Sequence, residues 1–427
     1  MEKKIAFISD HASPLAVIGG TDSGGQNVYV AQAAIELASV GYHVDVFTRW
    51  DDPSLPAVVD WKPGVRVVHV KAGPVQCIPK ENLLELMDEF RMNMVKFIRD
   101  EQQPYILVHA HFFMSALVAD QIKKELGIPY VVTFHALGII RKIYQGNNDK
   151  FPEERIAIER EVVKNADQII AECPQDKKDL VHFYDADESK ITIIPCGFNQ
   201  SEFYPVNKKL ARKELGLGEN EKILLQLGRM VPRKGVDNVI RAVAKLKSLG
   251  THCKLLIVGG DSQCADAMIT PEIGRLQSIA RDEGVEDQVI FAGNKSREQL
   301  KYFYSAADLF ITTPWYEPFG ITPLESMACG TPVIGSDVGG IKYTVVHGKT
   351  GLLVQPNDPK ELALSVNHVF NNPDWLESMR RHSISRVNAL FTWRNVSQML
   401  AEAYEAVWFT EFAPHTIRDN KKKNKAA

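Results

Sequence analysis

Short apolar segments alternate with stretches of helical periodicity over about the first 200 residues. In the stretch 26–40, for example, Val28, Ala31 and Ile35 fall on one side of a helix. Strands that are apolar on both faces and separated by helices predict a parallel sheet covered on both sides. The expected strands are 5–9, 44–48, 65–70, 106–110, 130–134, 168–171 and 191–194, and the expected helices are 26–40, 82–99, 115–126 and 153–165.

The alternation relaxes into a connector that contains Gly, Pro and Asn around residues 195–207, and then it starts again. The chain therefore predicts an α/β fold of two Rossmann-like, doubly wound domains, over residues 1–200 and 201–390. Ligands of such sheets bind beyond the carboxyl ends of the strands, so the chemistry is expected in loops that follow strands. The expected strands of the second domain are 223–227, 254–258, 289–291, 309–311 and 332–335, its helices are 236–248, 271–283, 297–305 and 323–329, and only helices follow residue 359, the last at 396–407.

Composition narrows the class of protein without changing this fold. The 427 residues carry a formal net charge of -3, which provides no basic field for nucleic acid. No apolar stretch approaches the roughly 18 residues of a membrane span, and the start of the chain is too weakly apolar for a signal peptide, so a cytoplasmic protein is expected. The 6 cysteines form no CxxC pair, which argues against zinc. The basic run at 421–425 predicts a disordered tail over residues 413–427.

A glycine-rich loop joins the first expected strand to the first expected helix. It contains Gly19, Gly20, Gly24 and Gly25. Backbone N–H groups of such a loop, together with the helix N-terminus, favour a bound anion. The alternative is a flexible turn in which a side chain caps the helix. His11 lies just beyond the same strand, and its position is equally consistent with ligand contact and with packing.

A basic pair follows the first expected strand of the second domain. Arg229 and Lys234 lie in the segment LGRMVPRKG, where the strand end would deliver both cations to a ligand site. Two fixed cations suit a leaving diphosphate, whose negative charge grows as its bond to a sugar breaks. A surface loop of solvated bases explains the same segment equally well, and Arg233 is expected to be solvated.

An acidic pair surrounds a Pro-Phe-Gly turn later in the second domain. Glu317 is expected in a loop after a strand, and Glu325 in the helix that follows. The backbone N–H groups of Phe319, Gly320 and Ile321 could hold phosphate between them. Glu325 can accept two hydroxyl hydrogen bonds, which suits a ribose, and Glu317 can do the same for a donor sugar. The alternative is a surface acid followed by an acid favoured by a helix dipole.

These segments together resemble the large family of retaining GT-B glycosyltransferases. Glu317 and Glu325, separated by seven residues within EPFGITPLESMACGTPVIGSDVGG, resemble its EX7E motif, and GRMVPRKG resembles its Arg–Lys diphosphate pair. TFHALG, which contains His135, is similar to its strand-end histidine loop. The family includes sucrose-phosphate synthases and the inositol-phosphate N-acetylglucosaminyltransferase of mycothiol synthesis. The resemblance extends over nearly the whole chain.

The resemblance implies an architecture and a mechanism. The two domains would face each other across a cleft, and a C-terminal helix at about 391–412 would cross back to the first domain. The second domain would hold the nucleotide sugar, with the base near Gly293 and Asn294. His135 would touch the donor hexose, and its backbone carbonyl would lie beside the reacting carbon. Transfer would proceed with retention and without cofactor or metal, because Arg229 and Lys234 would take the place of a metal ion.

The resemblance also implies an acceptor site in the first domain. SGGQNVYV, with Gly24, Gly25, Gln26 and Asn27, is similar to acceptor loops of both sucrose-phosphate synthase and the mycothiol enzyme. HASPL, which begins at His11, is similar to the mycothiol enzyme. Gly24 and Gly25 are also expected to lie near the donor.

Two bases fall where the mycothiol enzyme binds its acceptor phosphate. They are Lys80 and Arg155, for which solvated charges at helix ends are the alternative. Phe112 and Ala136, however, replace hydroxyl-bearing phosphate ligands of that enzyme. The segment HALG instead favours the sucrose-phosphate group.

The expected function is therefore transfer of a hexosyl group, most simply from UDP-glucose, to a phosphorylated small acceptor such as fructose 6-phosphate. Inositol phosphate is the alternative acceptor, and a lipid or polysaccharide acceptor is another. A protein that binds sugar nucleotides without catalysis would be expected to lack one of Arg229, Lys234 or Glu317, and all are present. Neither nucleic acid nor a membrane is expected as a partner, and a homo-oligomer is compatible with the sequence. The nucleobase, and glucose against N-acetylglucosamine or mannose, stay open.

Overall fold

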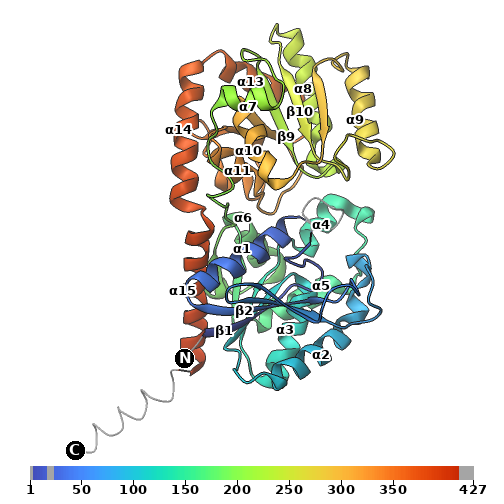
Figure 1. Ribbon diagram of the computed structural model, residues 1–427, viewed down its shortest axis with the longest axis vertical. Coiled ribbons are helices and arrows are strands. Elements are labelled where there is room, and N and C mark those ends of the chain that lie inside the picture. The colour runs from blue at the N-terminus through green and yellow to red at the C-terminus, as the bar shows by residue number, and fades with distance from the viewer. Residues whose placement is uncertain (1–2, 17–23, 413–427) are drawn as a thin grey trace, which may run out of the picture. The chain divides into compact units, whose positions relative to one another are not determined.

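The computed structural model describes residues 3–16 and 24–412 and divides into two compact units (Figure 1). The first unit contains residues up to Pro195 together with the final helix from Trp393, and the second contains Cys196–Thr392. The expected tail at 413–427, and Gly19 and Gly20 of the glycine loop, lie outside the described residues. Each unit is a Rossmann-like α/β domain, as the hydrophobic pattern predicts.

The first unit contains an eight-stranded sheet in the order β3-β4-β2-β1-β5-β6-β7-β8. Its strands are β1 (Lys3–Ile8), β2 (Tyr42–Arg49), β3 (Val58–Lys62), β4 (Val65–Val70), β5 (Leu107–His111), β6 (Tyr130–Thr133), β7 (Gln168–Ala171) and β8 (Ile191–Ile193). All pairings are parallel except that of β3 with β4. The sequence analysis missed β3, because this edge strand contains no fully buried residue and so lacks the apolar run of a central strand.

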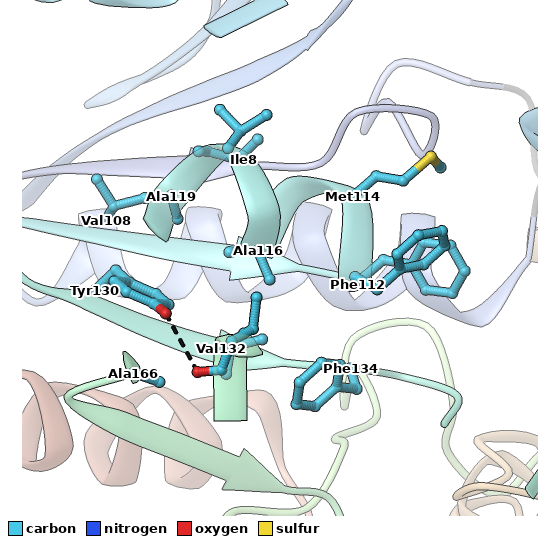
Figure 2. Packing of buried hydrophobic residues seen from close by; sticks show 14 of the residues in the cluster. Ile8, Val108, Phe112, Met114, Ala116, Ala119, Tyr130, Val132, Phe134 and Ala166 are labelled. Atoms are coloured by element: carbon cyan, nitrogen blue, oxygen red, sulfur yellow. Dashed lines mark hydrogen bonds between the residues drawn. The ribbon is translucent and has the colours of Figure 1, made fainter. Parts of the chain in front are cut away.

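Helices cover both faces of this sheet. One core contains side chains of α2 (Met87–Asp100), α3 (Phe113–Leu126), α5 (Glu154–Asn165) and α6 (Pro174–Tyr184). In Figure 2, Val108 of β5 and Tyr130 and Val132 of β6 pack with Ala116 of α3. The hydroxyl of Tyr130 donates to the carbonyl of Val162 at 3.2 Å, which satisfies the polar end of this buried ring.

The other face carries α1 (Gly25–Ser39) and α15 (Trp393–Phe412), the last helix of the chain (Figure 1). Trp393 lies edge-on to Tyr29 of α1, with ring centroids 5.4 Å apart. The hydroxyl of Tyr404 lies 2.6 Å from Nδ1 of His109, a buried residue of β5. The C-terminal helix therefore belongs to the core of the first unit; it is longer than the 396–407 of the hydrophobic pattern and close to the 391–412 that the resemblance implies.

The second unit contains a six-stranded parallel sheet in the order β11-β10-β9-β12-β13-β14. Its strands are β9 (Ile223–Leu227), β10 (Lys254–Val258), β11 (Val289–Gly293), β12 (Leu309–Thr312), β13 (Val333–Ser336) and β14 (Gly351–Val354). Its helices are α7 (Lys208–Glu214), α8 (Val236–Ser248), α9 (Pro271–Asp282), α10 (Arg297–Ala306), α11 (Thr322–Ala328), α12 (Ile341–Thr344), α13 (Pro359–Phe370) and α14 (Pro373–Leu390). The side chains of α8, α9 and α13 share one core with the sheet.

The strand orders fix where polar side chains meet. In the first sheet β1 lies between β2 and β5, and in the second β9 lies between β10 and β12. The chain reverses its direction of progress across the sheet at these positions, which opens a crevice at the carboxyl ends of the strands. His11 and His135 follow strands of the first sheet, and Arg229 and Glu317 follow strands of the second.

Candidate functional site

The candidate site of the second unit is built around an ion pair between Lys234 and Glu317. Lys234 ends a short 3-10 turn (Pro232–Lys234) that follows β9, and Glu317 lies in the loop after β12. Because β9 and β12 are neighbours, their loops bring Nζ of Lys234 into direct contact with Oε2 of Glu317. Nη1 of Arg233 lies 3.6 Å from the same oxygen, so Arg233 is part of the cluster rather than the solvated base that was expected.

Burial and charge shape the pKa values of this pair in opposite ways. Burial would raise the pKa of Glu317, but Lys234, Arg233 and Arg229 lower it to about 2. Burial lowers the pKa of Lys234 to about 8, against the opposing effect of Glu317. Glu317 is therefore ionised at neutral pH, and Lys234 is a cation that can lose its proton in mildly alkaline solution.

Two glycines brace the turn that carries Glu317. A Cβ on Gly339 would lie 1.8 Å from the carbonyl oxygen of Glu317, and one on Gly340 would lie 2.3 Å from Cα of Phe319. The N–H of Gly340 donates to the carbonyls of Glu317 at 3.2 Å and Pro318 at 3.1 Å. The sequence analysis missed both glycines as parts of the site, although the pair follows a strand just as the other glycine loop does.

Glu325 lies in α11 and is buried. Its Oε2 accepts from the hydroxyl of Tyr304 at 3.0 Å, and its Oε1 lies 3.2 Å from Nη1 of Arg297. Burial raises the pKa of Glu325, although Arg297 opposes the shift. Neither partner was expected, because both come from α10, which is distant in sequence. The expected contact of Glu325 with a ribose stays a prediction.

Asn294 lines a cavity of about 550 Å³ after β11. Gly293, the last residue of β11, has a φ of +72°, and a Cβ there would lie 2.3 Å from the carbonyl oxygen of Gln263. Only glycine fits this approach without a shift of the backbone. Of the two residues expected near the nucleobase, Asn294 lines this cavity, and Gly293 directly precedes it in the chain.

Histidines gather at the carboxyl edge of the first sheet. Nδ1 of His11 lies 2.9 Å from Oδ2 of the buried Asp10, at the end of β1. His135 follows β6 and has a φ of +57°, a left-handed conformation. Its Nε2 lies 3.1 Å from Nδ1 of His111, and its Nδ1 lies 3.0 Å from Oε1 of Glu172. His111 and Glu172 were not expected in the site, although each stands at or just after the end of a strand.

Burial keeps the histidines of β5 uncharged. It lowers the pKa of His109 to about 3, and the nearby His135 adds to the shift. Burial, His109 and His135 together hold the pKa of His111 well below its usual range. Behind Glu172, burial and the Glu172 charge raise the pKa of Asp176 to about 7.

The residues expected in the acceptor loop make contacts within the first unit. The amide of Asn27 is buried, accepting from the N–H of Gly24 at 2.9 Å and donating to the carbonyl of Ser13 at 3.0 Å. Nε2 of Gln26 lies 3.4 Å from the carbonyl oxygen of His111. Gly25 is exposed and begins α1, so its N–H group belongs to the first helical turn, where backbone donors have no partner within the helix.

The two bases expected to bind phosphate differ in exposure. Lys80 begins a short 3-10 turn and is half-buried. Arg155 is only 2% exposed, and its Nε donates to Oε1 of Glu159 at 2.8 Å. Its guanidinium carbon lies 4.7–4.8 Å from the ring centres of Phe112, Phe113 and Phe151. A phosphate could contact Arg155 only by replacing Glu159 or the aromatic rings around the guanidinium. Phosphate contact by Arg155 stays a prediction.

The described residues contain neither a metal-binding cluster nor a membrane-spanning helix. Residues 3–16 and 24–412 contain no group of three or more His, Cys, Asp or Glu arranged to hold a metal ion. Within the same ranges, no helix is long and apolar enough to cross a membrane.

Comparison with known families matches both units. Residues 207–386 match the family described as Glycosyl transferases group 1, and residues 23–202 match Glycosyltransferase Family 4. The two matches together span most of the chain.

Individual proteins are similar over nearly the full length. A D-inositol 3-phosphate glycosyltransferase from Thermobispora bispora is 33% identical over 408 residues, covering 94% of this chain and 94% of that protein. One from Rhodococcus erythropolis is 34% identical over 406 residues, covering 94% and 91%. The solved structure of sucrose-phosphate synthase from Thermosynechococcus elongatus is 34% identical with a TM-score of 0.87, covering 96% of this chain and 100% of that one.

Proposed function

The chain belongs to the group 1 glycosyltransferases of GT-B fold, and on that premise we propose that it transfers a hexosyl group, with retention, from a nucleotide diphosphate sugar to a small phosphorylated acceptor. UDP-glucose is the proposed donor. The observation that carries the proposal is the cluster of Arg229, Lys234 and Glu317 at the carboxyl ends of β9 and β12.

This cluster supplies cations for the diphosphate of a nucleotide sugar and a carboxylate for the hydroxyls of its sugar. Arg229 and Lys234 bind the diphosphate, and the N–H groups of Phe319, Gly320 and Ile321 complete its site. When the diphosphate binds, it displaces Glu317 as the main partner of Lys234, and the freed carboxylate accepts hydrogen bonds from sugar hydroxyls. In this proposal Glu325 binds the ribose, Gly293 and Asn294 lie at the base, and the main-chain carbonyl of His135 lies beside the reacting carbon.

The proposed step replaces one bond at the anomeric carbon by another on the same face. The bond from this carbon to the diphosphate oxygen breaks, and a bond to the acceptor hydroxyl oxygen forms. The acceptor proton passes to the leaving diphosphate, so no protein nucleophile or base is needed. Arg229 and Lys234 stabilise the negative charge that develops on the leaving group, which is the role a metal ion would otherwise have.

Inositol phosphate is the first acceptor to consider. The relatives named D-inositol 3-phosphate glycosyltransferases match over more than nine-tenths of the chain, and they favour this alternative over fructose 6-phosphate. Fructose 6-phosphate remains the second candidate, because the solved sucrose-phosphate synthase is equally similar in sequence. We place the acceptor near His11, Gly25 and Gln26, with Lys80 as the base for its phosphate.

A matched acceptor panel tests the proposal. The protein is incubated with UDP-glucose, with and without excess EDTA, and with inositol 3-phosphate, fructose 6-phosphate, or unphosphorylated inositol or fructose, and released UDP is measured. Release that depends on one of the phosphorylated acceptors supports the proposal. Release no faster than without acceptor would contradict the small-acceptor assignment, and loss of release on adding EDTA would contradict metal independence.

A further inference from the structure

Three neighbouring strands of the first sheet bring one residue each to a cluster of His111, His135 and Glu172. The sheet places β5, β6 and β7 side by side. His111 is the last residue of β5, His135 lies two residues beyond β6, and Glu172 is the residue after β7. Carboxyl ends of adjacent parallel strands share one edge of a sheet, so the three side chains meet there.

Both ring nitrogens of His135 already have partners inside the first unit. A carboxylate only accepts hydrogen bonds, so the 3.0 Å contact of Nδ1 with Glu172 places the proton of His135 on Nδ1. In the neutral ring, Nε2 of His135 carries a lone pair, and the 3.1 Å contact then makes Nδ1 of His111 the donor. Nε2 of the neutral His111 ring is then unprotonated. This atom is buried without a hydrogen-bond partner among the described residues, so no acceptor is present that would need a proton on it.

The same contacts hold the backbone of His135 in a conformation that residues other than glycine rarely adopt. Its φ of +57° turns the main chain sharply at the end of β6. The ring stacks on His111 with centroids 5.3 Å apart and meets the edge of Tyr29 at 4.9 Å. Asp176 in turn holds the backbone of Glu172, because its side-chain oxygen accepts a hydrogen bond from the N–H of Glu172 at 3.0 Å. The direction of the His135 carbonyl is therefore determined by its side-chain partners.

We propose that His111 and Glu172 are positioning residues for glycosyl transfer, which hold His135 as the Nδ1–H tautomer in a left-handed backbone conformation and so aim its main-chain carbonyl. Only the consequence for turnover rests on the proposed function, in which that carbonyl lies beside the reacting carbon. The imidazole then serves as an anchor for the backbone.

The tautomer can be measured without any donor or acceptor. In full-length protein labelled with ¹⁵N-histidine, long-range ¹H–¹⁵N spectra report which ring nitrogen carries the proton, and the His135→Gln and His111→Gln variants assign the signals. The expected result is a proton on Nδ1 in both rings, and a shift of the His135 proton toward Nε2 in Glu172→Ala. An Nε2–H tautomer of His135 in the unmodified protein would overturn the proposal, whatever its activity.

Turnover in paired variants separates positioning from a general effect on folding. Glu172→Ala should lower kcat about tenfold with little change in donor KM, since small misplacements of a reacting group are costly. Glu172→Gln keeps an acceptor oxygen and should restore most of the activity. In a His135→Gly background, Glu172→Ala should have no further effect, because glycine adopts positive φ without support.

Glu188, which is exposed at the start of the β8 region, provides the matched control, and Glu188→Ala should leave kcat unchanged. Equal losses from Glu172→Ala in both backgrounds would contradict the positioning role. If the unmodified protein transfers to no acceptor but shows the expected tautomers, the proposed function fails and the assignment of His135 stands.

Discussion

The two sheets carry polar clusters at equivalent edges, but the clusters work in different charge states. In the first unit, buried histidines of β5 stay neutral, with the pKa of His109 lowered to about 3 by burial. In the second unit, Glu317 is held ionised by three cations, with a pKa of about 2. The same topology thus supports a neutral hydrogen-bonded network in one domain and an ion cluster in the other.

Under the proposed function, the difference follows from what each edge binds. A diphosphate carries charge, so the proposed site needs cations that are already desolvated and held in place, and in this proposal Glu317 holds Lys234 until the ligand binds. A neutral hydroxyl and a developing positive charge on the sugar carbon need a carbonyl and fixed dipoles instead. Neutral histidines can fix a backbone without the desolvation cost of a buried charge.

The largest expected effect concerns the buried ion pair of Arg155 and Glu159 in the first unit. Glu159→Ala leaves the enclosed guanidinium of Arg155 without its carboxylate and should lower the free energy of unfolding by about 3–5 kcal/mol. Glu161 on the same helix pairs with Lys124 at the surface, and Glu161→Ala should cost less than about 1 kcal/mol. Urea denaturation measures both. Similar losses in the two variants would contradict a stabilising role of the Arg155–Glu159 pair.

Lys234→Ala tests whether the ion cluster of the second unit is catalytic. Removal of the cation should lower kcat by about a hundredfold or more while the protein stays folded, since one contact to a developing charge has this weight. Lys209→Ala, at an exposed lysine of α7, is the control and should be silent. Steady-state release of the nucleotide measures the effect. Near-normal turnover in folded Lys234→Ala would contradict a catalytic role for the ion cluster of the second unit.

Gly339→Ala tests the turn that carries Glu317. The added Cβ would lie 1.8 Å from the Glu317 carbonyl oxygen, so the turn must shift, and donor KM should rise about tenfold. Gly348 has a φ of +76° with nothing within 4 Å of its Cβ, so Gly348→Ala carries the backbone strain without the clash. Equal effects of the two substitutions on KM would show that strain alone, and not the close approach, is responsible.

The smallest expected effect is a dependence on pH that arises in the second unit. Because the pKa of free Lys234 is about 8, its charge is present below pH 8 and is lost as the pH rises above it. The value of kcat/KM for the donor should therefore fall above pH 8, approaching about tenfold per pH unit. Lys234→Arg keeps its charge and should flatten this limb. His109 adds nothing between pH 5 and pH 9, because its pKa of about 3 keeps it neutral there. An unchanged alkaline limb in Lys234→Arg would assign the titration to another group.

The sequence predicted well those parts of the fold whose signal is local. The ranges of β9 and α8 match the predicted 223–227 and 236–248, because a continuous apolar run and an amphipathic period mark them. The helix α4 (Gly138–Gln145) was missed, since it is only 8 residues long and Gly138 is its only fully buried residue.

The same limit applies to the site. Lys234 and Glu317 could each be proposed as site residues because each follows a strand, but their direct ion pair was not predicted. Arg297 beside Glu325, and Glu172 beside His135, could not be predicted, because only the packing of separate elements brings them together. A carboxylate partner for a histidine carries no signal in the sequence until the order of the strands is known.

The most direct test of the central claim is the product itself. The protein is incubated with UDP-[1-¹³C]glucose and inositol 3-phosphate or fructose 6-phosphate, and the ¹³C spectrum of the mixture is recorded. The account predicts a new anomeric signal of α configuration in a phosphorylated product, matching the configuration of the donor. A β-configured product, or labelled free glucose as the only product with either acceptor, would contradict it.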